Sequence, residues 1–230
     1  MDKIAVKALT FDLFGTILDL GGSLTPFIAR FLADRNSATS PQEFWEQWRR
    51  RQRLEQYQDN ILLLGHSGYL EVARRALVYT LALNKVESGT ADVAELMRAW
   101  DQLSPFSEVL PALERLGQRY RLVVLSNGDV HFLDHLVKNR LGRDFDAVIS
   151  VAAVGAFKPH PGVYRYAASA LELEVGQCLM VSANSFDVMG ARACGLRGAF
   201  VNRYALPYED TTHRPDVIVD DFTALADALC

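Results

Sequence analysis

Short apolar segments alternate with helical segments in the second half of the chain, and this alternation leaves few folds open. A helix between two strands allows them to run parallel, and strands of such apolar character are buried on both faces. We therefore expect an α/β fold with a doubly wound parallel sheet and a Rossmann-like core. The expected strands are Arg121–Leu125, Asp146–Ser150, Cys178–Ser182, Ala199–Val201 and Val217–Val219, with helices at 107–119, 130–140, 160–171 and 188–194.

The first strand of this sheet is expected at Ile4–Leu9, directly before the stretch Thr10-Phe11-Asp12-Leu13-Phe14-Gly15-Thr16. An Asp that follows a parallel strand lies at the edge where open α/β sheets bind their ligands. Gly15 permits a sharp turn, and the Thr16 hydroxyl can bond a substrate oxygen or cap the next segment. Asp12 is therefore a candidate catalytic residue.

Residues 20–103 form a long helical block in which no strand is expected. Ser23 is a candidate N-cap for the first of its helices, and Ser40-Pro41 opens the second with a cap followed by proline. Glycines at 65 and 68 interrupt the pattern, and His66 between them is expected at the surface. The expected helices are 24–33, 41 through 54, 69–81 and 91–103.

This block interrupts the alternation of strands and helices, so we interpret it as an insertion after the first strand. The predicted division is a catalytic core of residues 1–19 and 104–230 and a helical cap of residues 20–103. A cap over the carboxyl edge of the sheet closes a pocket there and excludes water from it.

Composition limits the partners of the chain. A net charge of −4 and a pI near 5.7 argue against a nucleic-acid partner, and no apolar run approaches the roughly 20 residues that span a membrane. Cys178, Cys194 and Cys230 are odd in number and widely spaced, which fits neither a disulfide framework nor a zinc site. We expect a cytoplasmic protein that acts on a small molecule.

Polar residues follow several of the expected strands, and in a doubly wound sheet such strand ends converge on one crevice. They are Asp12, the pair Ser126 and Asn127, Lys158, and the segment 182–187. In this order they resemble the four motifs of the haloacid dehalogenase superfamily. Three features resemble its L-2-haloacid dehalogenase branch: Phe14, the Ser182-x-Asn184-x-x-Asp187 spacing with Phe157 to Tyr164 before it, and Trp48-Arg49 followed by Gln52 and Leu54-Glu55.

This resemblance implies a hydrolase that needs no metal and no cofactor. Asp12 would attack the α-carbon of a small carboxylic acid and form an ester, while Lys158 compensates the buried negative charge. Water activated near Asp187 would then release a 2-hydroxy acid, with Thr16 and Asn184 orienting Asp12 and the water. The resemblance also implies a homodimer.

The same resemblance supplies the expected substrate-binding residues. Backbone amides at Leu13 and Phe14, with Ser126 and Ser182, would anchor the substrate carboxylate, and Arg49 would receive the departing anion. Tyr164 would bond Lys158 or Asp187. The remaining expected pocket residues are Asn127, Tyr69 and Phe186.

Three alternatives stay open at this point. A magnesium-dependent phosphatase is disfavoured, because that branch carries an acid where Phe14 stands and paired acids where this chain has Asp187 alone. A non-catalytic binding module is disfavoured because Asp12, Lys158 and Asp187 are all present. Hydrolysis of L-azetidine-2-carboxylate, with a ring nitrogen as leaving group, fits four departures from the branch near the pocket: Phe14 for Tyr, Gly21-Gly22 for His, Arg50 for Gln, and about two extra residues before Gly65.

Overall fold

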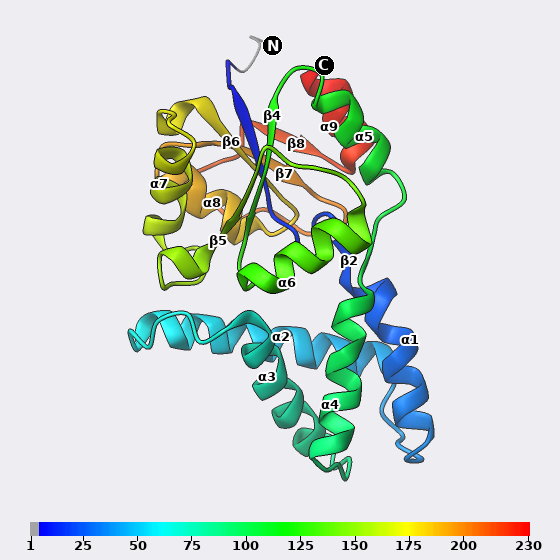
Figure 1. Cartoon of the computed structure of the whole chain (residues 1–230). Helices are drawn as coiled ribbons and strands as arrows, with labels where there is room; N and C mark the ends of the chain where they lie inside the picture. The colour runs from blue at the N-terminus through cyan, green and yellow to red at the C-terminus, as the bar shows by residue number, and fades with distance from the viewer. Residues whose placement is uncertain (1–4) are drawn as a thin grey trace.

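The computed structural model describes residues 5–230 and contains a six-stranded parallel sheet at its centre (Figure 1). The strand order is β5-β4-β1-β6-β7-β8, so the first strand lies in the middle, with Phe11 opposite Val124 on one side and Val181 on the other. The predicted α/β class with a parallel sheet is therefore confirmed. The strands are β1 (Ala8–Phe11), β4 (Arg121–Ser126), β5 (Ala147–Ser150), β6 (Cys178–Ser182), β7 (Arg197–Val201) and β8 (Val217–Val219).

Helices cover both faces of this sheet (Figure 1). Because side chains alternate along a strand, Leu122 and Val124 of β4 pack into one apolar cluster, while Val123 and Leu125 pack into another. The first cluster includes α5 (Val109–Leu116), α6 (Val130–His135) and α9 (Phe222–Leu229), and the second includes α7 (Pro161–Ala170) and Ala191 of α8 (Ser185–Ala193).

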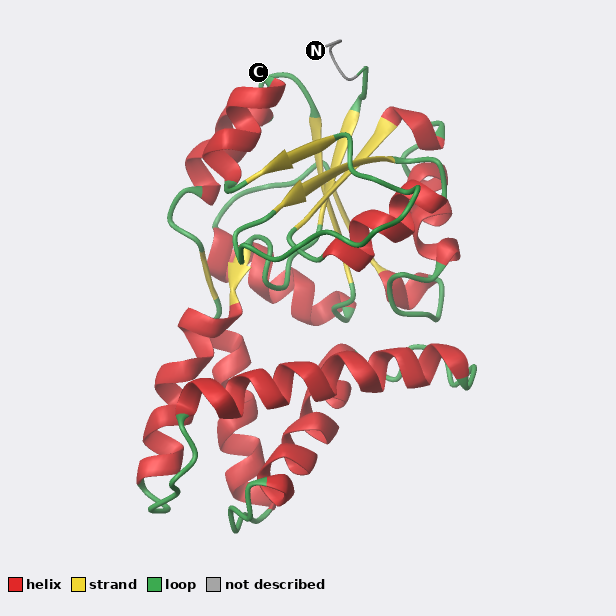
Figure 2. Cartoon of the chain, turned by 180° about the vertical axis from the view of Figure 1, so that it is seen from behind, coloured by secondary structure: helices red, strands yellow, loops and turns green. Residues whose placement is uncertain are grey.

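Four helices inserted after β1 lie beyond the carboxyl ends of the strands (Figures 1 and 2). We call them, with the 3₁₀ turn that follows, the helical insertion; its last residue is Gln102. The chain enters and leaves it through a short antiparallel ladder between β2 (Leu18–Asp19) and β3 (Ser104–Pro105). Its helices are α1 (Leu20–Ala33), α2 (Pro41–Ile61), α3 (Tyr69–Leu83) and α4 (Thr90–Arg98).

Shorter helical turns complete the fold. A π-helical turn continues α6, and three 3₁₀ turns follow α4, β5 and α7. Among residues 5–230, no helix combines the length and the apolar character that crossing a membrane requires. The π-helical turn after α6 is Leu136–Leu141. The 3₁₀ turns after α4, β5 and α7 are Ala99–Gln102, Val151–Ala153 and Val175–Gln177.

Several element boundaries differ from the predicted ones. The first strand runs from Ala8 to Phe11 rather than from Ile4, which lies outside the described residues. Ser23 is not an N-cap, because α1 begins at Leu20 and Asp19 caps it by accepting the Gly22 N–H at 2.8 Å. The C-terminal helix α9 was not predicted, and α5 ends at Leu116, three residues early.

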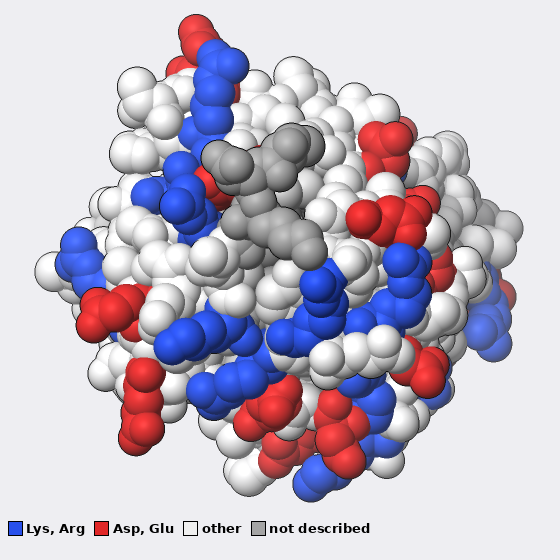
Figure 3. Space-filling view, turned by 90° about the horizontal axis from the view of Figure 1, so that it is seen from above, with Lys and Arg blue, Asp and Glu red and all other residues white. Residues whose placement is uncertain are grey.

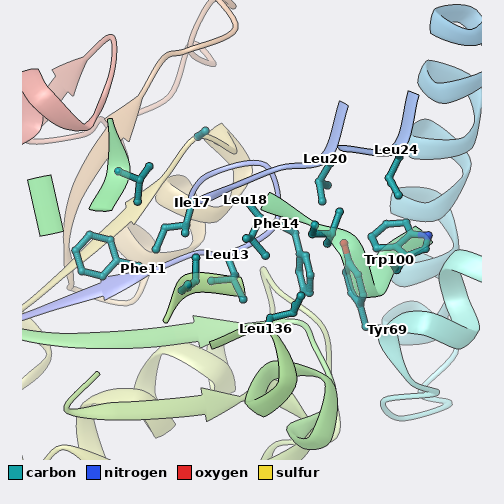
Figure 4. Close-up of a cluster of buried hydrophobic side chains, with 14 of the residues drawn as sticks. Phe11, Leu13, Phe14, Ile17, Leu18, Leu20, Leu24, Tyr69, Trp100 and Leu136 are labelled. Carbon is teal, nitrogen blue, oxygen red and sulfur yellow. The ribbon is translucent and has the colours of Figure 1, made fainter. Parts of the chain in front are cut away.

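An apolar cluster joins the insertion to the sheet near the point of entry (Figure 4). Phe14, from the loop after β1, stacks on Tyr69 of α3 with ring centroids 3.9 Å apart and packs edge-on against Trp100. All three side chains are almost completely buried. This contact therefore fixes the insertion relative to the end of β1.

Charged side chains of both signs share the face opposite the insertion (Figure 3). Lys and Arg gather across the middle of this face, with Asp and Glu beside them. This face is therefore neither uniformly positive nor uniformly negative.

We expect Trp100→Ala to destabilise the fold by about 3–5 kcal/mol, because the substitution empties a large site in the apolar cluster. Denaturant unfolding monitored by circular dichroism measures this change. Leu83→Ala, at an exposed position of α3, is the matched control and should stay within about 0.5 kcal/mol of the wild type. Equal effects of the two substitutions would contradict the packing described for Trp100.

Candidate active site

Asp12 lies directly after the central strand, and its two carboxylate oxygens have different surroundings. Its N–H continues the ladder by donating to the Val181 carbonyl, which fixes the backbone. Oδ2 accepts hydrogen bonds from Thr16 Oγ1 at 2.7 Å and Asn184 Nδ2 at 2.8 Å. Within the described part of the chain, residues 5–230, the one donor to Oδ1 is the ammonium of Lys158, at 3.4 Å. Oδ2 is therefore saturated with donors, and Oδ1 keeps a lone pair for a reaction.

The turn after β1 brings Thr16 back to Asp12. Gly15 has a φ of +84°, a conformation that strains other residues, and its N–H donates to the Leu18 carbonyl. Thr16 Oγ1 also accepts the Ala183 N–H at 2.9 Å, so its own proton is directed to Asp12. The sequence Gly15-Thr16 thus produces a donor of fixed orientation.

Lys158 is 1% exposed and lies between two carboxylates. Its Nζ is 3.4 Å from Asp12 Oδ1 and 3.0 Å from Asp187 Oδ2. The Asp187 side chain, in the first turn of α8, also accepts the Tyr164 hydroxyl at 2.7 Å. Burial raises the pKa of Asp187, and the Lys158 ammonium opposes that rise. Asp187 is thus a more basic carboxylate than an exposed Asp.

Tyr164 comes from α7, and its bond to Asp187 matches one of the two predicted partners. Burial and the adjacent Asp187 charge hold the pKa of Tyr164 well above its ordinary value. Its hydroxyl therefore stays protonated and donates to Asp187.

The serines after β4 and β6 hold loops together. Ser126 Oγ accepts the Gly128 N–H at 3.3 Å, and Ser182 Oγ accepts the Asn184 N–H at 3.1 Å. Neither side chain lines the pocket described below. Asn127 does line it, and its Oδ1 accepts the Lys158 N–H at 2.9 Å, which fixes the loop that carries the lysine.

A narrow pocket of about 10 Å³ lies over these groups. The predicted site residues Leu13, Thr16 and Tyr164 lie behind it: Leu13 packs in the apolar core, and the other two contact Asp12 and Asp187. In residues 5–230, no group of three or more His, Cys, Asp or Glu side chains could hold a metal ion. The lining residues are Asp12, Phe14, Arg49, Gln56, Tyr69, Asn127, Lys158, Asn184, Phe186 and Asp187.

Aromatic rings form one wall of the pocket. Phe14 and Tyr69 stack almost in parallel, at an interplanar angle of 9°. Burial raises the pKa of Tyr69 to about 12, so its hydroxyl remains a neutral phenol beside Arg49. Phe186 is half-buried and packs edge-on against Tyr57 of α2. This wall gives the pocket an apolar side next to the carboxylates.

One face of α2 supplies the polar wall, and the sequence interpretation identified only part of it. Arg49 lies 3.5 Å from the Phe14 carbonyl, which is consistent with its predicted place in the pocket. Arg53 and Gln56 were missed: Arg53 Nη2 donates to Asn184 Oδ1 at 2.5 Å, and Gln56 Oε1 lies 3.5 Å from Asn127 Nδ2. Spacings of four and seven residues from Arg49 place both on the same helix face, which is the signal that could have revealed them.

The expectation that His66 lies at the surface is wrong. Its side chain is 5% exposed, and its Nε2 lies 2.9 Å from the Asn127 carbonyl. Nearby, the Asn60 side chain donates to the Phe157 carbonyl and accepts the Phe157 N–H. These contacts tie the far end of α2 to the two loops that carry Asn127 and Lys158.

Comparisons with known proteins agree with this geometry. A family model described as haloacid dehalogenase-like hydrolase matches residues 6–195. The (S)-2-haloacid dehalogenase of Xanthobacter autotrophicus is 34% identical over 86% of this chain and 76% of its own length. A solved L-2-haloacid dehalogenase matches with a TM-score of 0.90 at 28% identity, over 98% of this chain and 99% of its own. The X. autotrophicus enzyme with chloropropionic acid covalently bound matches with a TM-score of 0.84 at 28% identity, over 96% and 97%.

We expect Lys158→Met to destabilise the protein at neutral pH by about 3–5 kcal/mol, because it leaves two buried carboxylates without a cation. The deficit should shrink as the pH falls, since protonation then removes the unpaired charges. Urea unfolding at several pH values measures it. Lys138→Met, at an exposed position, should be neutral, and a pH-independent loss in Lys158→Met would contradict the charge argument.

We expect Tyr164→Phe to move the acid limb of the kcat–pH profile to higher pH. A base must be deprotonated, and the Tyr164 hydroxyl lowers the pKa of Asp187 against the rise that burial causes. Without this donor the pKa of Asp187 rises further, so activity is lost at a higher pH on acidification. Tyr166→Phe, on the exposed side of α7, is the control. A shift to lower pH would contradict the expectation from the sequence that Asp187 activates the water.

Proposed function

The chain belongs to the haloacid dehalogenase-like hydrolase family, and we propose that it hydrolyses small (S)-2-haloacids to 2-hydroxy acids through an ester on Asp12. The observation that carries this proposal is the Asp12 carboxylate, with Oδ2 held by two donors and Oδ1 in contact with one ammonium. A buried carboxylate with one fixed and one available oxygen is suited to attack a carbon atom. The chloropropionic acid bound covalently in the X. autotrophicus relative supports the same chemistry here.

In the first step, Asp12 Oδ1 attacks the substrate α-carbon. A bond forms between Oδ1 and that carbon while the carbon–halogen bond breaks, and the halide leaves with the bonding electrons. Arg49, on the α2 wall of the pocket, is the cation proposed to receive this anion. Because the pocket excludes water, the carboxylate is poorly hydrated and is a better nucleophile than in solution.

In the second step, water attacks Asp12 Cγ and gives up a proton to Asp187. The Cγ–Oδ1 bond then breaks, and Oδ1 takes the proton back from Asp187 and leaves as the hydroxyl oxygen of the product. Asp12 keeps Oδ2 and gains the water oxygen, and the second proton of that water is released to solvent as the carboxylate is regenerated. The raised pKa of Asp187 supports this role, since a more basic carboxylate accepts a proton more readily.

The charges around the pocket support a substrate with a single negative charge. Arg49, Arg53 and Lys158 carry three positive charges, and Asp12 and Asp187 carry two negative charges when ionised. One substrate carboxylate would balance this set. A phosphate ester brings about two charges and needs an acid for its leaving alcohol, yet the position two residues after Asp12 holds the stacked ring of Phe14.

The same charges favour a halide over a ring nitrogen as leaving group. The amine of L-azetidine-2-carboxylate is protonated at neutral pH, so binding would bring an ammonium near the guanidinium groups of Arg49 and Arg53. A halide leaves as an anion and is attracted by them. Ring opening is therefore the second candidate, to be tested beside dehalogenation.

A single turnover in ¹⁸O water tests the proposal. We expect (S)-2-chloropropionate to release chloride in the presence of EDTA and to leave the label in the peptide that contains Asp12. Asp12→Asn should abolish turnover, because an amide is a far weaker nucleophile. Asp220→Asn, at an exposed position, should react like the wild type.

Other outcomes of this experiment would overturn the assignment. Primary amine released from L-azetidine-2-carboxylate, without halide release from any haloacid, would assign ring opening. Magnesium-dependent phosphate release from small esters, without either activity, would assign a phosphatase. Chloride release with no label in Asp12 would contradict the ester intermediate.

A further inference from the structure

We propose that Arg53 is a positioning residue for the second step: it fixes the Asn184 amide, which stabilises the oxyanion formed on Asp12 Oδ2 during ester hydrolysis. This inference rests on the proposed function and adds a residue to it. Arg53 lies on α2, one helical turn after Arg49.

The two ends of the Asn184 amide face different partners. Its Oδ1 accepts a hydrogen bond from Arg53 Nη2, and its Nδ2 donates to Asp12 Oδ2 at 2.8 Å. An asparagine amide has one acceptor and one donor end, and a guanidinium can only donate. With the reversed amide, Nδ2 would face the guanidinium and Oδ1 would face a carboxylate oxygen. The Phe14 carbonyl, 3.5 Å from Nδ2, favours the same orientation, and Arg53 is the donor that holds the Oδ1 end of the amide in the orientation in which Asn184 donates to Asp12.

The oxygen that receives this donor gains charge only in the second step. When water attacks Cγ, the carbonyl electrons of the ester move onto Oδ2. Thr16 Oγ1 and Asn184 Nδ2 already contact Oδ2 at hydrogen-bond distance, so they form an oxyanion hole. In the first step the reacting oxygen is Oδ1, and Oδ2 gains no charge. Loss of Arg53 should therefore slow the two steps unequally.

Arg53 is held in a partly desolvated place. Burial, together with the nearby Arg49, lowers the pKa of Arg53 to about 10, so the guanidinium remains charged at neutral pH. Its guanidinium carbon lies 5.5 Å from the centre of the Phe186 ring, on the pocket wall. A charge in such surroundings is weakly screened and polarises the Asn184 amide more strongly than an exposed arginine would.

Rapid-quench kinetics with (S)-2-chloropropionate separates the two steps. Chloride release reports ester formation, and mass spectrometry of the Asp12 peptide reports ester decay. We expect Arg53→Met to release about one chloride per site at close to the wild-type rate, while ester decay slows about 10- to 100-fold and the ester accumulates. Arg53→Lys, which keeps a cationic donor, should recover part of the decay rate, and Arg98→Met, at an exposed position of α4, should match the wild type.

Each other result has a definite meaning. An increase in KM with unchanged ester decay, or equal slowing of both steps, would overturn the inference, because Arg53 would then act on the substrate or on the fold. Arg53→Gln supplies the same comparison if Arg53→Met does not fold. If the wild type forms no ester, the proposed function itself is refuted. This result is obtained with the wild type alone, before any variant is compared.

Discussion

The site depends on one buried ammonium that is shared by two carboxylates. Taking Lys158, Asp12 and Asp187 out of water is unfavourable for each of them alone, and becomes acceptable only through their mutual attraction and further hydrogen bonds. The supporting elements follow from this requirement. The central strand positions Asp12, α8 positions Asp187, and the loop before α7 brings Lys158 between them. Because β1 lies in the middle of the sheet, these groups are far from its solvent-exposed edges.

The helical insertion adds positive charge to this buried set. Its helix α2 presents Arg49 and Arg53 on one face, four residues apart, toward the carboxyl edge of the sheet. The sheet by itself provides two carboxylates and one ammonium at the site, and so has no excess positive charge for an anionic substrate. In the proposed mechanism, binding of the anionic substrate therefore depends on the insertion, and so does the exclusion of water.

The sequence predicted the strands after the insertion well because the interiors of these buried strands are apolar, as in β4 and β6. It placed Asp12, Lys158 and Asp187 through the order of the motifs. The prediction from the sequence was wrong where two residues suit the same local role equally well and only tertiary contacts decide between them. Asp19 and Ser23 are both good N-caps, and the β2–β3 ladder extends the chain to Asp19. Helical periodicity groups Arg53 with Arg49, but only the packing of α2 shows which face meets the sheet.

The contacts between insertion and sheet differ along α2, and this difference bears on access to the pocket. Near the β2–β3 ladder the contact is apolar, through Phe14, Tyr69 and Trp100. At the far end of α2 it is more polar: the hydrogen bonds of Asn60 and His66 accompany the ring contacts of Tyr57 with Phe186 and of His66 with Phe157. Opening an apolar contact exposes apolar surface to water and loses the whole free energy of its burial. Polar groups that separate form hydrogen bonds to water instead, so the net free-energy cost is small. Separation at the far end of α2 is therefore the less costly way to admit a substrate, and it also withdraws Arg53 from Asn184. In the proposed mechanism, the oxyanion hole would then be complete only when the pocket is closed, which links ester hydrolysis to the exclusion of bulk water.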